Sequence, residues 1–278
     1  MKDIYFIAEA GINHNGSLKT ALELIDVAAE AGCDAVKFQK RTPEICVPNN
    51  VRDQIRETPW GEMTYFEYKK KIEFGKDEYD EISRHAMKKG IAWSASAWDI
   101  PSLEFLDTYD LPFHKIASAL STHQNFILEV AKRGKKTFAS VGMCTYDEID
   151  HLVSIFKEVG TPLVLMHTIS TYPADETELN LRMIQTYKDR YGIEVGYSGH
   201  ETSISPSIVA AAIGAVAIER HITLDRSMWG TDHAASLEPS CLRNLMGSLR
   251  KVNNVLGDGV KREVQGEKNV AAKLRYWN

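Results

Sequence analysis

The chain lacks any apolar stretch that approaches the roughly 20 residues of a membrane-spanning helix. The apolar run within residues 1–9 is too short for a secretory signal, and no small-residue cleavage site follows it. The four cysteines, Cys33, Cys46, Cys144 and Cys241, are scattered, without the spacing of a disulfide framework or a metal site. These absences predict a reduced protein of the cytoplasm.

A strong excess of one charge is missing as well. The 278 residues carry a formal net charge of -5, and 26% of them are charged. Nucleic acid and anionic membrane attract strongly basic proteins, so neither is expected as a partner. With 44% hydrophobic residues, the composition is that of an ordinary globular enzyme acting on small molecules.

Short apolar runs alternate with longer segments of helical periodicity along the chain. The predicted strands are residues 4–9, 34–39, 91–97, 113–118, 136–141, 163–168, 193–198 and 216–221. The predicted helices are residues 18–31, 77–89, 101–109, 124–133, 146–159, 179–191, 205–213 and 239–256. Eight strands, each followed by a helix, predict an α/β fold of the (β/α)8 TIM-barrel type.

A barrel of about 250 residues would use nearly the whole chain, so residues 1–278 are predicted to form a single domain. The alternative is a doubly wound open sheet, which carries about five or six strands and a glycine-rich phosphate turn after the first. Here the first turn, residues 11–16, lacks the GxGxxG spacing, which favours the barrel. The long connection at residues 41–76 is expected to be a lid or an interface.

Two of the predicted strands lead directly into a histidine. His200 follows the seventh strand, and His221 ends the eighth. In a parallel barrel these positions lie side by side at the carboxyl edge, where active sites form. Two neutral imidazoles meeting there can bind a divalent metal, and the loop after His221 adds Asp225, Asp232 and His233.

Other strand ends are more polar than a stable barrel requires. Strand one ends in Glu9, and Lys37 and Lys115 lie inside apolar strands. Because a buried lysine is almost always paired, the two lysines imply an anionic partner, either a carboxylate such as Glu9 or a bound acid. Serine hydroxyls at the same edge are suitable donors to phosphate oxygens. The set predicts a ligand that carries phosphate and carboxylate, next to a metal.

Eight motifs, in order along the chain, resemble those of the sialic acid synthases, which condense phosphoenolpyruvate with an N-acetylated hexosamine. They are AEAGINHNG (8–16), VKFQKR (36–41), HKIAS (114–118), SVGM (140–143), HTISTYP (167–173), YSGH (197–200), ERHITLD (219–225) and GTDHAASLEP (230–239). The resemblance implies a homo-oligomeric transferase that forms a C–C bond between phosphoenolpyruvate and an aldose such as N-acetylmannosamine. The products would be a 2-keto-3-deoxy sugar acid and phosphate.

The resemblance also implies roles for the matching residues. A divalent metal, manganese with magnesium or cobalt as alternatives, would be held by His200 and His221. Phosphoenolpyruvate would be bound by Lys37, Ser96, Lys115, Ser118, Ser140, Ser170 and Ser198. The sugar would meet Glu9, Gln39, Tyr172 and Asp232. The catalytic set would be Glu9, Lys37, Lys115, His200 and His221, with the lysines offsetting substrate charge and Glu9 moving a proton or orienting the sugar or water.

The chain departs from the family pattern at three positions. Ser96 stands where better-known members have threonine, and Ser170 where many have asparagine, so both keep a hydrogen-bonding group. Leu120 replaces a glutamate that contacts the sugar, which leaves the identity of the sugar open. The family's C-terminal antifreeze-like domain, which lends an arginine to the partner subunit's site, is expected to be absent from residues 1–278.

Three other functions remain as alternatives. An octulosonate- or heptulosonate-phosphate synthase would share the anion site but should show a fuller metal set and a pocket for a sugar phosphate. A metal-dependent hydrolase on a barrel usually carries a His-x-His pair on strand one, where this chain has Glu9 between two alanines. A non-catalytic barrel that binds a sugar acid need not retain the histidine pair and the two lysines.

Overall fold

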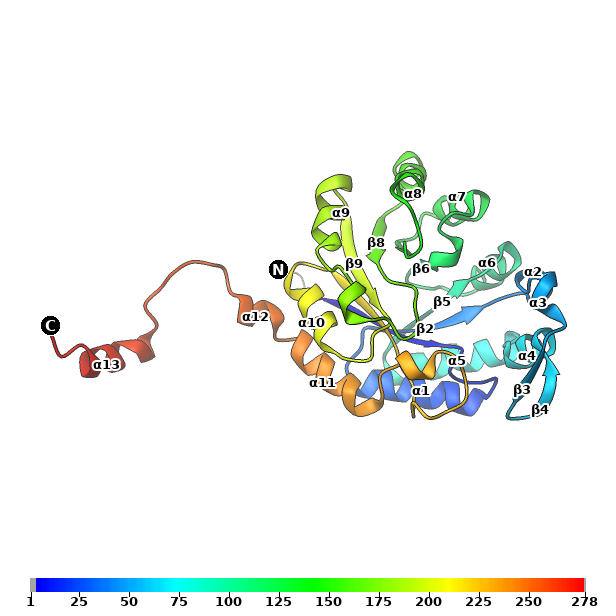
Figure 1. The fold of residues 1–278 in the computed structure, drawn as a ribbon, viewed down its shortest axis with the longest axis horizontal. Helices are drawn as coiled ribbons and strands as arrows, with labels where there is room; N and C mark the ends of the chain where they lie inside the picture. Colours follow the sequence, from blue (N-terminus) through cyan, green and yellow to red (C-terminus); the bar gives the residue numbers. More distant parts are fainter. Residues whose placement is uncertain (1–3, 278) are drawn as a thin grey trace.

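The computed structural model describes residues 4–277, and eight parallel strands of this part of the chain close into a barrel (Figure 1). The strands are β1 (Tyr5–Gly11), β2 (Ala35–Lys40), β5 (Ala92–Ala97), β6 (His114–Ile116), β7 (Thr137–Ser140), β8 (Leu163–His167), β9 (Glu194–Gly199) and β10 (Ala217–His221). Around the barrel they follow the order β1-β10-β9-β8-β7-β6-β5-β2. The predicted TIM barrel is therefore confirmed.

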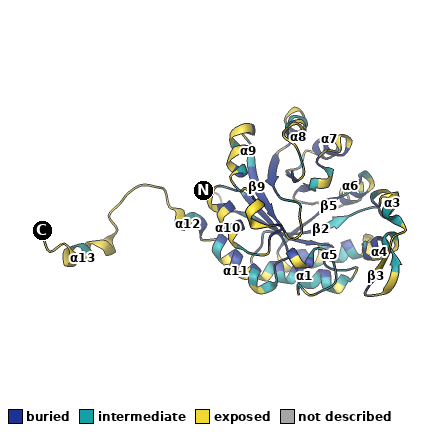
Figure 2. Cartoon of the chain, in the orientation of Figure 1, coloured by how far each residue is buried: buried dark blue, intermediate teal, exposed yellow. Residues whose placement is uncertain are grey.

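Helices cover the outside of the barrel (Figure 1). They are α1 (Leu18–Glu30), α5 (Lys76–Lys89), α6 (Ile100–Leu106), α7 (Gln124–Lys132), α8 (Tyr146–Val159), α9 (Met183–Tyr191), α10 (Ser205–Ala212) and α11 (Pro239–Leu249). Thr145 begins α8 with a capping box in which its side chain and that of Glu148 each bond to the other's backbone amide. The buried faces of the helices and the outer faces of the strands form the main core (Figure 2).

Apolar side chains fill the barrel interior near the starts of the strands. They are Ile7, Ala35, Phe113, Phe138, Val164, Met166 and Ala217, with the Tyr5 ring stacked on that of Phe138. These side chains occupy the barrel axis toward its amino-terminal end, where a cavity of about 360 Å³ lies beside the rings of Tyr5, Phe113 and Phe138. The polar interior positions consequently lie at the carboxyl end.

The connection after β2 folds into small elements of its own. They are α2 (Pro43–Cys46), α3 (Asn49–Arg52), the antiparallel hairpin of β3 (Ile55–Thr58) and β4 (Gly61–Thr64), and α4 (Tyr65–Ile72). Asp99 fastens the start of this connection to the barrel, since its carboxylate accepts a 2.6 Å hydrogen bond from the Thr42 amide. The connection stands at one side of the barrel mouth (Figure 1).

Several element ends differ from the predicted ones. The fourth strand stops at Ile116 because Ser118 turns the chain into a 3-10 helix, Ser118–Leu120. The helix predicted at 239–256 is divided at Arg250, whose guanidinium bonds to the Ile4 and Gly32 carbonyls and so ends α11; α12 (Val252–Leu256) follows. The last helix, α13 (Gln265–Leu274), extends away from the barrel (Figure 1). Among residues 4–277, none of the helices is long and apolar enough to cross a membrane.

Candidate active site

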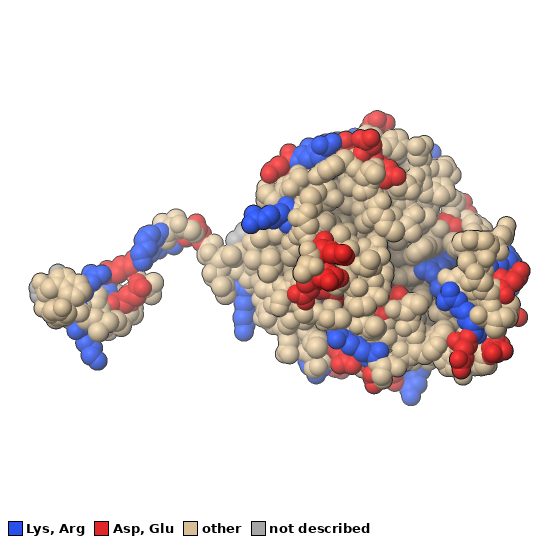
Figure 3. Space-filling model, viewed as in Figure 1, with Lys and Arg blue, Asp and Glu red and all other residues tan. Residues whose placement is uncertain are grey.

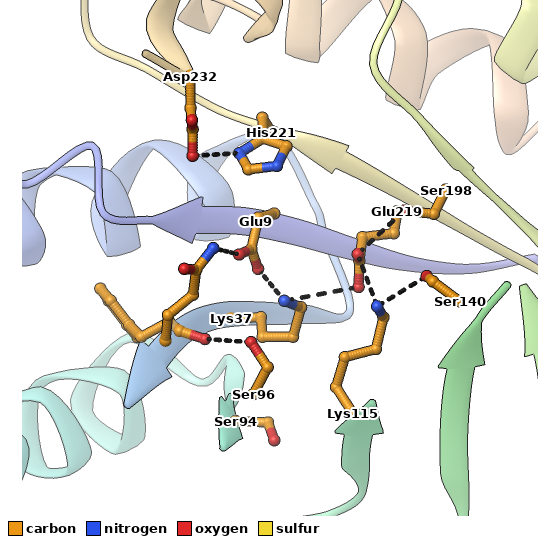
Figure 4. Close-up of polar contacts among 12 residues, drawn as sticks. Glu9, Lys37, Ser94, Ser96, Lys115, Ser140, Ser198, Glu219, His221 and Asp232 are labelled. Atoms are coloured by element: carbon orange, nitrogen blue, oxygen red, sulfur yellow. Dashed lines mark hydrogen bonds and ion pairs between the residues drawn. The ribbon is translucent and has the colours of Figure 1, made fainter. Parts of the chain in front are cut away.

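Two buried lysines and two buried glutamates form the floor of a cavity at the carboxyl end of the barrel (Figure 4). β1 pairs with β2 so that Glu9 lies opposite Lys37, and their side chains form an ion pair. Glu219 on β10 lies between the lysines, with its carboxylate oxygens 3.8 Å from Lys37 Nζ and 3.4 Å from Lys115 Nζ. The Lys37–Glu9 contact is the ion pair that the sequence offered as one explanation of Lys37.

The neighbours of this cluster shift the protonation of its members. Burial lowers the pKa of Lys115, which donates a 2.8 Å hydrogen bond to Ser140 Oγ. Burial acts to raise the pKa of Glu219, but Lys115 and Lys37 outweigh it and hold that pKa below its usual range. Glu219 also accepts a 3.1 Å hydrogen bond from Ser198 Oγ. Glu219 is therefore an anion that matches lysine charge inside the cavity.

Hydroxyl groups line the wall of the cavity beside β5, β6, β7, β8 and β9. They belong to Ser96, Ser118, Ser140, Ser170 and Ser198. The Gly142 amide donates a 3.1 Å hydrogen bond to Ser118 Oγ, and a Cβ added at Gly142 would lie 2.2 Å from Ser170 Oγ. Because residue 142 is a glycine, the hydroxyls of Ser118 and Ser170 can lie next to its backbone. Ser118, Gly142 and Ser170 form a cradle of hydrogen-bond donors that suits an oxyanion.

His200 and His221 lie next to each other above the lysines, with ring centroids 5.5 Å apart. Burial lowers the pKa of His200 to about 3, so its imidazole is neutral near pH 7. His200 Nδ1 lies 2.6 Å from the Ile169 carbonyl oxygen, which requires the proton on Nδ1 and leaves Nε2 with a free lone pair. His221 Nδ1 is buried without a hydrogen-bond partner among the described residues.

The imidazole nitrogens of His200 and His221 are of the ligand type that divalent transition metals prefer. Both are buried at the cavity, and His200, with its proton fixed on Nδ1, presents Nε2 in the form that ligates a metal. Within residues 4–277 no group of three or more His, Cys, Asp or Glu side chains could hold a metal ion together. The protein therefore offers two ligands, and other coordination positions would fall to water or substrate.

Among the residues assigned to the sugar, Glu9 and Gln39 lie toward the floor of the cavity, and Tyr172 and Asp232 lie beside the histidines. Gln39 Nε2 donates a 2.9 Å hydrogen bond to Glu9 Oε1, and the Tyr172 ring lies 4.0 Å from that of His200. Asp232 Oδ2 is 3.9 Å from His221 Nδ1 (Figure 4). Leu120, in contrast, packs against the main core.

Of the loop residues grouped with the histidines in the sequence, Asp232 alone approaches the cavity. Asp225 accepts a hydrogen bond from the Ser227 amide in its own turn, and His233 Nδ1 lies 2.7 Å from Thr223 Oγ1. These side chains hold the loop together, so the expectation that they join the histidines was wrong for both.

The cavity has a volume of about 210 Å³. It is lined by every residue predicted to bind phosphoenolpyruvate, by both histidines, and by Glu9, Gln39 and Tyr172. The sequence interpretation missed Glu219 and Trp98, which also line it. Glu219 precedes His221 by two residues on one strand, and this period of two could have placed both on the inner face.

A parallel barrel whose carboxyl end gathers buried lysines, serine hydroxyls and a histidine pair defines a class: a TIM-barrel enzyme for an anionic substrate. A family model described as the NeuB family matches residues 24–261. The chain belongs to the NeuB family and is an enzyme of that family.

Three relatives show how far the likeness extends. The chain is 36% identical over 277 residues to N,N'-diacetyllegionaminic acid synthase of Campylobacter jejuni, covering 97% of this chain and 83% of the relative. It is 37% identical over 282 residues to N-acetylneuraminate-9-phosphate synthase of Homo sapiens, covering 98% and 78%. The crystal structure of N-acetylneuraminic acid (sialic acid) synthetase from Leptospira borgpetersenii, in complex with citrate, superposes with a TM-score of 0.87 at 33% identity, covering 99% of this chain and 93% of that chain.

Proposed function

We propose that this protein condenses phosphoenolpyruvate with an open-chain aldose of the hexosamine type to give a 2-keto-3-deoxy sugar acid. The observation that carries the proposal is the convergence of Lys37, Lys115 and the serine hydroxyls on one cavity beside the histidine pair. The names of the relatives, which are synthases of sialic-type acids, support the same reaction.

The reaction forms one C–C bond and breaks the bond between C2 and the phosphate oxygen of phosphoenolpyruvate. C3 of phosphoenolpyruvate attacks the aldehyde carbon, and the aldehyde oxygen takes a proton to become a hydroxyl group. Water adds at C2, which bears the cationic character, and loss of phosphate leaves the keto group. One aldose, one phosphoenolpyruvate and one water thus give one sugar acid and one phosphate.

The side chains divide this work by position. Lys37 and Lys115 hold the carboxylate and phosphate of the enol donor, and the hydroxyls beside Gly142 donate to phosphate oxygens. Glu9 is 1% exposed and sits between Lys37 and Gln39, where it can orient the sugar or water and move a proton.

His200 and His221 would hold a divalent ion, manganese with magnesium or cobalt as alternatives. Such an ion supplies Lewis-acid polarisation of the aldehyde oxygen when it is bound. Around it the chain's own groups position the acceptor: the Tyr172 ring covers His200, and the Asp232 carboxylate faces His221 and can accept hydrogen bonds from sugar hydroxyls.

The test incubates the protein with manganese, phosphoenolpyruvate and a panel of aldoses, and measures phosphate release together with 2-keto acid. We expect both products in equal amounts with at least one aldose. No turnover with any aldose, while the metal site is occupied, would refute the proposal.

A matched pair of variants tests the histidines. His221→Ala should lose turnover and manganese binding but keep the fold, whereas His151→Ala, which removes an exposed imidazole on α8, should lose neither. Metal binding is followed by equilibrium dialysis and the fold by circular dichroism. Manganese binding retained in His221→Ala would contradict the assignment.

A further inference from the structure

Two cations beside the barrel mouth, Lys69 and Arg41, form no ion pair with a carboxylate of residues 4–277. Lys69 on α4 is only 9% exposed, and its ammonium contacts the rings of Tyr65 and Tyr68, with Nζ 5.3 and 5.1 Å from their centroids. Among residues 4–277 it makes no hydrogen bond or ion pair. A buried ammonium without a counter-ion is costly unless an anion joins it.

The second cation is Arg41, which follows β2 directly. Its guanidinium carbon lies 4.0 Å over the Trp98 ring, and it donates to the side-chain oxygen of Gln39. Arg41 Nε is buried without a hydrogen-bond partner in the described part of the chain. Because Trp98 and Gln39 line the cavity, the guanidinium stands at its wall.

Both cations lie on the sugar side of the site. Each acts electrostatically on Asp232, whose carboxylate faces His221. Glu73 is matched to another cation, since its carboxylate lies 2.7 Å from Lys40 Nζ. The Asp232 carboxylate thus faces two cations, Lys69 and Arg41. Figure 3 shows Lys and Arg side chains gathered beside the central hollow on the side of α3 and α4.

We propose that Lys69 and Arg41 form a phosphate subsite for the far end of the acceptor, so that the aldose is a sugar phosphate. The inference rests on the proposed function. A planar guanidinium binds two phosphate oxygens at once, and an ammonium adds a compact charge, which together suit a phosphate group. The phosphate of the enol donor is not the source of this demand, because its proposed place is the cavity floor beside Lys37, Lys115 and the serine hydroxyls.

Electrostatics at Lys69 agree with a missing anion. Burial, and the nearby Arg41 after it, lower the pKa of Lys69 to about 8. The ammonium remains mostly protonated at pH 7, in a place where its charge is unmatched. A phosphate between Lys69 and Arg41 would remove the repulsion between them as well as the unmatched charge.

The experiment compares N-acetylmannosamine 6-phosphate with N-acetylmannosamine as acceptors, at saturating phosphoenolpyruvate. We expect kcat/KM to be at least about tenfold higher for the phosphorylated sugar, as charge-assisted contacts supply. Lys69→Met should lower kcat/KM for the sugar phosphate by about tenfold, mainly through KM, and leave the neutral sugar within about twofold. Lys69→Arg should restore most of the preference.

Lys70→Met is the matched control, because Lys70 neighbours Lys69 on α4 but is exposed and pairs with Glu44. It should change neither kcat/KM value. A wild-type preference for the neutral sugar, or an equal loss for both sugars in Lys69→Met, would overturn the inference while the proposed function stands. If neither sugar nor any other aldose reacts, the proposed function fails and the subsite falls with it. A calorimetric titration of the sugar phosphate into Lys69→Met protein checks that binding, and not folding, has changed.

Discussion

Replacing Glu219 by glutamine should lower the unfolding temperature of the protein. It should also increase the rise in unfolding temperature that phosphoenolpyruvate causes. The carboxylate lies 3.4 Å from Lys115 Nζ and 3.8 Å from Lys37 Nζ, and all three side chains are almost fully buried. Glutamine keeps the size of the side chain and its bond to Ser198 but removes the charge. The two lysines would then share a single carboxylate, that of Glu9.

The magnitude follows from the two distances. At an effective dielectric constant of about 20, each contact corresponds to roughly 4–5 kcal/mol of Coulomb attraction, part of which the lysines recover from water and from Glu9. Breaking a buried ion pair by removing one partner costs about 3–5 kcal/mol. For a chain of this size, about 2 °C per kcal/mol predicts that the unfolding temperature of Glu219→Gln falls by about 6–10 °C.

Thermal unfolding with and without phosphoenolpyruvate, in metal-free buffer, tests the prediction. The variant should regain part of its lost stability with the ligand, and its ligand-induced shift should exceed that of the wild type, because the charge it lacks is of the sign that the ligand brings. Glu129→Gln, at the surface ion pairs with Lys132 and the half-buried Arg133, is the control and should change the unfolding temperature far less than Glu219→Gln. A loss below about 1 kcal/mol, or equal ligand shifts in variant and wild type, would refute the charge balance inferred for this cluster.

Three further variants test other parts of the molecule. Gly142→Ala should raise KM for phosphoenolpyruvate at least about tenfold while preserving the fold, since its Cβ would lie 2.2 Å from Ser170 Oγ; a KM within about twofold of wild type would contradict the cradle. Arg220→Met should cost about 3–5 kcal/mol in chemical denaturation, because Glu201 would lose its 2.9 Å partner in a fully buried pair, and the double variant with Glu201→Gln should cost less than the sum. Burial lowers the pKa of His14 to about 3, so its contribution to stability is complete above about pH 6.5 and is lost as the pH falls toward 3; His14→Gln should flatten that part of the stability profile.

The barrel and the inner half of the site follow from short-range patterns in the sequence. A strand places alternate residues on one face, and parallel strands end at one edge, so Lys37, Lys115 and His221 could be placed together without coordinates. The same period of two extends from His221 to Glu219. Glu219 therefore shares the inner face of its strand with His221, and the pattern alone predicts this placement.

The outer half of the site depends on the path of the long connection, which local patterns do not determine. Lys69 reads as one of three consecutive lysines on a solvent-exposed helix, yet α4 packs it against Tyr65 and Tyr68. Its burial arises from contacts between α4 and the loop that carries Trp229, whose ring lies 5.1 Å from that of Tyr68. Residues far apart in the sequence are in contact there, and the spacing of residues along the sequence does not predict such long-range contacts.

The charges of the two halves differ in a way that bears on the chemistry. At the floor, Lys37 and Lys115 are already matched by Glu9 and Glu219, so the lysines alone cannot neutralise a ligand that carries both carboxylate and phosphate. The serine hydroxyls add hydrogen-bond donors there, and an ion at the histidine pair would add positive charge. At the mouth the cations exceed the carboxylates, and a phosphate can bind there without such help. On these two proposals, binding of phosphoenolpyruvate at the floor depends on groups besides the two lysines. Binding of the acceptor at the mouth depends on the negative charge that the acceptor carries.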